Sequence, residues 1–112
     1  MPRGWRLRIE DILEAIANIQ EDIGKMNFEH FLKDRKTRNS VVRELQIIGE
    51  AARYVPLEIE SRYSEIPWKL MRGMRNVVVH EYFGVDWAII WQTAQTNLPP
   101  LISKLQKILE EN

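Results

Sequence analysis

The chain has 112 residues, with 16 basic and 16 acidic side chains, so its formal net charge at pH 7 is zero and any binding of nucleic acid requires a local basic patch. Cysteine is absent, which excludes disulfide bonds, thiol catalysis and zinc sites built from cysteine. The sequence lacks both a run of about 18 apolar residues and an apolar signal segment, so we expect a single cytoplasmic domain over residues 1–112.

Apolar residues at helical spacing predict a first helix over residues 5–24, which Gly24 ends. An aromatic segment from Asn27 then runs into a charged stretch, residues 33–38. This stretch is most simply a solvated helix face or loop and only secondarily an RNA contact. A further helix follows, whose apolar side consists of Val41, Leu45, Ile48, Ala52 and Val55.

The opposite side of that helix carries a polar stripe, Arg43, Gln46, Glu50 and Arg53. The stripe has two interpretations. The first is an ordinary solvated face. The second applies if this helix lies along the helix of residues 70–84: Arg43 and Glu50 would then support a functional cleft, and Arg43 would bind substrate. Gly49 lowers helix stability by about 1 kcal/mol relative to alanine, which predicts a close approach of two helices at this point.

The connections and the C-terminal half are also read as helical. Pro56 and Pro67 stand where helices can begin, and we expect a turn around residues 57–59 with Tyr63 as its anchor. Pro99 and the proline after it separate the last two helices. The helix before them buries Trp87, Ile90, Trp91 and Ala94. We predict an all-α, up-and-down bundle of four to five helices.

Residues 70–84 divide into two faces when they are placed on a helical wheel. The apolar face contains Leu70, Met71, Met74, Val77 and Val78. The polar face contains Arg72, Arg75, Asn76 and His80. Asn76 and His80 are neighbours at i, i+4, and Arg75 and His80 lie at opposite edges of the polar arc, where they can hold one group from two sides. Gly84 is a stop signal, and Asp86 is the expected N-cap of the next helix.

This combination of side chains suggests a chemistry. Histidine transfers protons in both directions near neutral pH, and the planar donors of arginine suit a phosphate. With no carboxylate cluster for a metal, the pair fits metal-independent cleavage of RNA, in which a base removes the proton of the 2′-hydroxyl. We expect neither a metal site nor a cofactor. On spacing alone, however, one histidine near a helix end is more often a capping or surface residue.

The order Arg75, four residues, His80, one residue, Tyr82 resembles the Arg-x4-His-x-Tyr motif of the HEPN superfamily, specifically of the HepT-like ribonuclease toxins. Residues 42–52 also resemble the first signature helix of that family. The second half of the family's sequence pattern is similar to this chain at residues 66–68, 75–86, 91 and 98–99. The resemblance covers essentially residues 5–110 and implies a HEPN-like fold that forms a homodimer, with the motifs of both subunits at a shared cleft.

The resemblance also implies an activity. The chain would be the endoribonuclease toxin of a toxin–antitoxin system, with Arg75 and His80 as catalytic residues, Asn76 orienting His80 or a phosphate oxygen, and Arg72 guiding the RNA unless it is simply solvated. A nucleotidyltransferase antitoxin would adenylylate Tyr82, although that tyrosine can also be read as packing against the end of the bundle. Two alternatives are a non-catalytic, substrate-binding partner of a nucleotidyltransferase and, least favoured, a purely structural dimerisation module.

Overall fold

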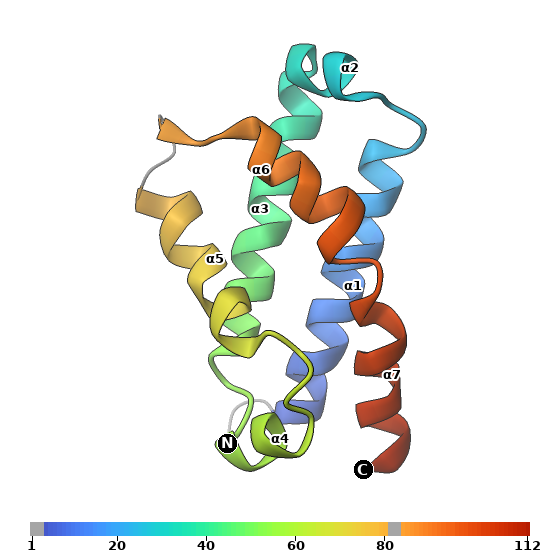
Figure 1. Cartoon of the computed structure of the whole chain (residues 1–112), viewed down its shortest axis with the longest axis vertical. Helices are drawn as coiled ribbons and strands as arrows, with labels where there is room; N and C mark the ends of the chain where they lie inside the picture. The colour runs from blue at the N-terminus through green and yellow to red at the C-terminus, as the bar shows by residue number, and fades with distance from the viewer. Residues whose placement is uncertain (1–3, 81–83) are drawn as a thin grey trace.

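The computed structural model describes residues 4–80 and 84–112, and for residues 76–80 it describes the backbone alone. Within these ranges every regular element is helical (Figure 1). The elements are α1 (Trp5–Ile23), α2 (Phe28–Lys33), α3 (Arg35–Ala52), α4 (Leu57–Arg62), α5 (Trp68–His80), α6 (Trp87–Gln92), the π-helical segment η2 (Thr93–Asn97) and α7 (Leu101–Glu111). The all-α prediction is confirmed for the described residues. The helices outnumber the four or five expected because the short connections, including residues 57–59, form helices themselves.

The central helix α3 packs against α1 on one side and α5 on the other (Figure 1). Both neighbours run antiparallel to α3, as in an up-and-down bundle. The α6–η2 segment crosses the bundle toward α1, and α7 then runs beside α1. This arrangement leaves α5 at the outer edge of the bundle, so a helix that carries reactive groups can expose one face.

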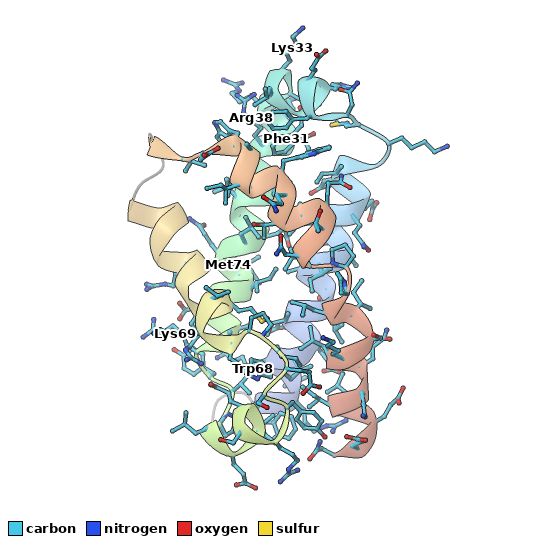
Figure 2. All side chains as sticks on the ribbon, in the orientation of Figure 1. Phe31, Lys33, Arg38, Trp68, Lys69 and Met74 are labelled. Carbon is cyan, nitrogen blue, oxygen red and sulfur yellow. The ribbon has the colours of Figure 1, made fainter. Side chains whose placement is uncertain are left out.

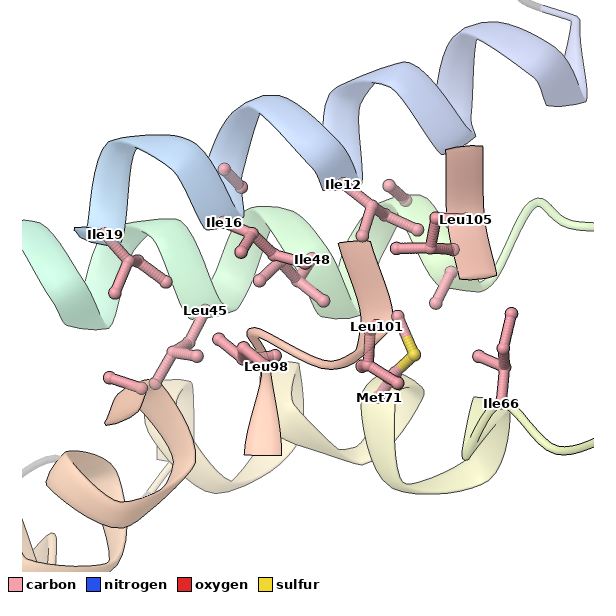
Figure 3. Close-up of a cluster of buried hydrophobic side chains, with 14 of the residues drawn as sticks. Ile12, Ile16, Ile19, Leu45, Ile48, Ile66, Met71, Leu98, Leu101 and Leu105 are labelled. Carbon is pink, nitrogen blue, oxygen red and sulfur yellow. The ribbon is translucent and has the colours of Figure 1, made fainter. Parts of the chain in front are cut away.

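One continuous apolar core joins these helices, as Figure 3 shows. The predicted apolar sides of α1 and α3 are buried, and Ile16 and Ile48 have no exposed surface. The C-terminal half contributes Leu98, Leu101, Leu105 and Ile108. Burying a side chain of this size contributes about 1.5–3 kcal/mol, so the shared core is what fixes α5 relative to α3.

Among the described side chains, the apolar face of α5 differs from the prediction at one residue, and the side chains of Val77 and Val78 lie outside the described part of the chain. Met71 is fully buried, and Met74 packs against the core, as expected. Leu70 was expected beside them and is instead 72% exposed. The reason is the angular position on the helix. Arg75 meets α3, the buried Met71 lies one turn before it, and Leu70 is about 100° away from Met71.

Capping residues explain where several helices begin and end. Gly24 ends α1 with a positive φ of 53°, a conformation that glycine adopts without strain. Asp34 begins α3 by accepting the N–H of Thr37 at 3.0 Å, and this hydrogen bond lowers the pKa of the Asp34 carboxyl. The predicted N-cap Asp86 is confirmed, because its carboxylate accepts the N–H groups of Ala88 and Ile89 at the start of α6.

Tyr63 anchors the turn into α5 and not a turn at residues 57–59, which belong to α4. Tyr63 is buried, and its hydroxyl donates a hydrogen bond to Glu111 at 2.6 Å. Its carbonyl accepts the indole N–H of Trp68 at 3.1 Å. These contacts fix the first turn of α5 against the C-terminal end of α7.

Among the described residues, no helix combines the length and the apolar character that a membrane span requires.

Candidate active site

The helices α3 and α5 approach each other closely at Gly49, as the sequence predicted. A Cβ atom added to Gly49 would lie 2.6 Å from the backbone nitrogen of Arg75 and 2.9 Å from its Cβ. Carbon atoms in ordinary contact are about 3.5–4.0 Å apart, so only glycine allows the two helices to come this close. The contact places the backbone of Arg75 directly against α3.

The side chain of Arg75 is held by the next residue of α3. Its Nε atom lies 2.7 Å from a carboxylate oxygen of Glu50, and Arg53 lies 3.5 Å from the same oxygen. Both members of the Glu50–Arg75 pair are about two-fifths exposed, so the pair adds at most about 1 kcal/mol to stability. Its main effect is geometric, because the carboxylate fixes the guanidinium beside α3. Of the two interpretations of the polar stripe, Glu50 fits the supporting one.

A basic hollow of about 510 Å³ opens beside this contact, and its lining residues are Arg53, Lys69, Arg72, Gly73 and Arg75. Arg72 is also fixed, because its guanidinium lies 2.6 Å from the carboxylate of Glu60 in α4. Four of the five lining residues are cations, which provides the local basic patch that a chain of zero net charge requires for binding a polyanion.

Two members of this hollow, Arg53 and Lys69, were not assigned a role from the sequence. Lys69, Arg72 and Arg75 follow one another at intervals of three residues, and side chains at that spacing lie on one face of a helix. Figure 2 shows Lys69 projecting from the first turn of α5, away from the core. That spacing could have identified Lys69. The position of Arg53 beside α5 depends on the register between two helices, which the sequence does not contain.

Arg43, expected to bind substrate, lies elsewhere in the single chain. It lines a second hollow, of about 300 Å³, between α1 and α3, with Asp11, Glu14, Ala15, Asn18, Glu44 and Ile47. The structure therefore brings Arg72 and Arg75 together and does not bring Arg43 to them. Since α3 and α5 are antiparallel and meet at Gly49 and Arg75, Arg43 lies near the level at which α5 ends.

The remaining motif residues are described only in part. The backbone of α5 is helical through His80, so Asn76 and His80 lie about one turn apart and His80 lies about 7.5 Å along the axis from Arg75. The side chains of Asn76 and His80 lie outside the described part of the chain, as does Tyr82 entirely. Their catalytic and modification roles stay predictions.

Another side of α5 borders an apolar hollow of about 580 Å³. Its walls come from α3, α5, α6, η2 and α7, and they include Leu70 and Ile89, which are 72% and 60% exposed. Exposed apolar side chains around an apolar hollow are typical of a surface that contacts another protein. Lys69 and Gly73 line both hollows, so the basic surface and the apolar surface meet along the first turns of α5.

Comparison with known proteins gives a consistent result. Residues 12–108 match the model of the family described as "Ribonuclease HepT-like". A relative from Thermococcus cleftensis, named "Probable ribonuclease HepT", is 42% identical over 108 residues, which are 96% of this chain and 98% of the relative. Another, "Putative RNase MJ0127" from Methanocaldococcus jannaschii, is 36% identical over 95% of this chain and 88% of its own length. No solved structure matches the chain significantly.

Proposed function

This chain belongs to the ribonuclease HepT-like family, and we propose that it is a metal-independent endoribonuclease that acts as the toxin of a toxin–antitoxin system. The observation that carries the proposal is the placement of Arg75. Glu50 holds this arginine at a close contact of two helices, and the arginine faces a hollow lined by three further cations. A site of this kind suits the charge that develops on a phosphate during cleavage.

In the proposed reaction, His80 removes the proton from a ribose 2′-hydroxyl, and the 2′-oxygen attacks the adjacent phosphorus atom. Arg75 stabilises the negative charge of the pentacoordinate intermediate, and Asn76 orients His80 or a phosphate oxygen. The bond to the 5′-oxygen breaks, that oxygen takes a proton from water, and His80 releases the proton that it removed to solvent. One product ends in a 2′,3′-cyclic phosphate and the other in a 5′-hydroxyl.

The activity can be tested with purified protein, RNA and a chelator. We expect cleavage to persist, and we expect His80→Ala and Arg75→Ala to lower it by at least about 100-fold, the usual contribution of general acid–base catalysis. Because Arg75 lies at a helix contact, Arg75→Lys and a thermal unfolding curve of each variant control for misfolding. Equal cleavage by the parent and the variants would reveal a contaminating nuclease.

The proposed active form is a homodimer in which a second copy of the chain covers the apolar hollow beside α5. Leu70 and Ile89, exposed on either side of that hollow, supply apolar surface for such an interface. Sedimentation should show a dimer for the parent and a shift toward monomer for Leu70→Ser combined with Ile89→Ser. A parent that is monomeric at the concentrations at which it cleaves RNA would disprove the dimer.

The proposed antitoxin is a nucleotidyltransferase that transfers AMP to the hydroxyl of Tyr82. An added AMP near Arg75 would bring negative charge to the phosphate site and repel RNA. Mass spectrometry of the toxin co-expressed with the nucleotidyltransferase should show a gain of one adenylate on Tyr82. An inactive complex in which Tyr82 is unmodified would rule out this control.

The alternative is a non-catalytic, substrate-binding partner of a nucleotidyltransferase. The four cations of the basic hollow favour it, since they can hold a phosphate whether or not His80 transfers a proton. The chelator experiment separates the two functions, because a binding partner would retain RNA without cutting it.

A further inference from the structure

We propose that Arg53 and Lys69, together with Arg72, form a binding track for the backbone of single-stranded RNA, which leads the strand away from Arg75 toward the first turn of α5. This inference rests on the proposed ribonuclease function and adds to it the path of the substrate. The track is defined as the basic hollow without Arg75, and it joins the C-terminal end of α3 to the first turns of α5.

The spacing along α5 supports a linear path. Lys69, Arg72 and Arg75 are separated by three residues each, so successive side chains are about 4.5 Å apart along the helix axis. The row therefore extends about 9 Å from Arg75, and long side chains extend its reach further. A single phosphate at Arg75 does not use the far end of this row, whereas a continuing strand does.

The charges in the track are available for a ligand to different degrees. Arg72 is held by Glu60, in the way that Glu50 holds Arg75, so its position is fixed in advance. Arg53 shares Glu50 at 3.5 Å with half of its side chain exposed, and an exposed pair of this kind is worth little. Among the described carboxylates, none forms an ion pair with Lys69. A phosphate can therefore engage Lys69 and Arg53 without displacing a strong internal partner.

Gly73 allows a ligand to come close to the helix. A Cβ atom added at this residue would meet no atom within 4 Å, so its position opens into free space within the hollow. Among the described residues, those that line the hollow include no aromatic side chain on which a base could stack. Contacts of this type read the phosphate backbone and not the bases, so we infer that the track raises affinity for RNA of any sequence.

The test is a binding measurement with fluorescein-labelled, single-stranded RNA of mixed sequence in which every ribose is 2′-O-methylated, so that the protein cannot cut it. We expect Lys69→Ala and Arg53→Ala each to weaken binding and to lower the slope of log K against log salt by about 0.7, the value for one phosphate contact on a single strand. The double variant should lower the slope by about twice that amount, and the decrease should be the same for RNAs of different sequence. Lys107→Ala is the matched control, because it removes one cation from α7, on the other side of the bundle (Figure 1).

The result that overturns the track is an affinity and a salt slope in the double variant equal to those of the parent and of Lys107→Ala. A second result would also overturn the track. If Lys69 and Arg53 are needed for AMP to bind but not for RNA to bind, the hollow holds a mononucleotide and not a strand. Thermal unfolding of each variant confirms folding, and Lys69→Glu, which should weaken binding more than Lys69→Ala, provides a further graded measurement.

Failure of the track and failure of the proposed function give different results. If the double variant binds like the parent while His80→Ala loses cleavage of unmodified RNA, the track is wrong and the ribonuclease stands. If the parent binds RNA through Lys69 and Arg53 but never cuts it, the track stands without the ribonuclease. In cleavage assays the double variant should raise KM more than it lowers kcat, as expected for residues that bind RNA away from the scissile bond.

Discussion

Gly49→Ala perturbs the contact on which the site is built. The new Cβ would lie 2.6 Å from the backbone nitrogen of Arg75 and 3.1 Å from its Cα. Relief requires α3 and α5 to move apart by roughly 1 Å, because a backbone cannot rotate away as a side chain can. Overpacking of this kind typically lowers the free energy of unfolding by about 1–3 kcal/mol, while the better helix propensity of alanine returns about 1 kcal/mol. We expect a net loss of up to about 2 kcal/mol.

Gly73→Ala is the matched control, since it makes the same chemical change in the middle of the partner helix. The added Cβ meets nothing within 4 Å, so only the gain in helix propensity remains. We expect this variant to be more stable than the parent by up to about 1 kcal/mol. The propensity gain is common to the two variants, so the difference between them isolates the overpacking cost of about 1–3 kcal/mol.

Urea unfolding followed by circular dichroism measures both free energies on one scale. We expect Gly49→Ala to unfold at a lower urea concentration than the parent, and Gly73→Ala at a higher one. If both variants shift in the same direction by similar amounts, α3 and α5 do not meet at Gly49. Cleavage adds a second readout, because Gly49→Ala should also displace Arg75 and lower kcat under conditions in which the protein is fully folded.

Two further predictions concern individual carboxylates. Glu50→Ala should lower kcat by up to about 100-fold with little change in the urea midpoint, because a misplaced Arg75 loses its geometry while an exposed ion pair adds little stability; an unchanged kcat would show that Glu50 does not position Arg75. For Asp34, the hydrogen bond from Thr37 lowers the pKa of the carboxyl below the ordinary 3.8. The charged carboxyl therefore stabilises the fold above pH 3.8, and this stabilisation disappears as the pH falls through the lowered pKa. Thermal unfolding should show the parent more stable than Asp34→Asn at neutral pH and a shrinking difference on acidification, and a difference that grows in acid would contradict this assignment.

Local signals in the sequence predicted the helices and one helix–helix contact. Isoleucines at helical spacing gave α1, and the Asp86 N-cap follows from the preference of a helix start for a side-chain acceptor. The close approach at Gly49 was predictable because glycine in mid-helix lowers stability unless it serves packing. Each of these inferences needs only neighbours in the chain.

Features that depend on how two helices are placed were not predictable. The exposure of Leu70 follows from which stripe of α5 faces α3, because Leu70 is exposed although the next residue, Met71, is buried. The position of Arg53 beside Lys69 depends on the register of α3 against α5. Arg43 belongs to the same polar stripe as Glu50 but lines a hollow shared with α1. A helical wheel shows which residues share a face and not which neighbour that face meets.

Analysis of the RNA ends tests the central claim most directly. If an imidazole removes the 2′-proton and Arg75 stabilises the resulting charge, the protein should convert RNA to fragments with 2′,3′-cyclic phosphate and 5′-hydroxyl ends in the presence of chelator. It should leave the same sequence with 2′-O-methyl riboses intact. Cleavage of the 2′-O-methylated strand, or fragments that carry 5′-phosphate and 3′-hydroxyl ends, would contradict the account.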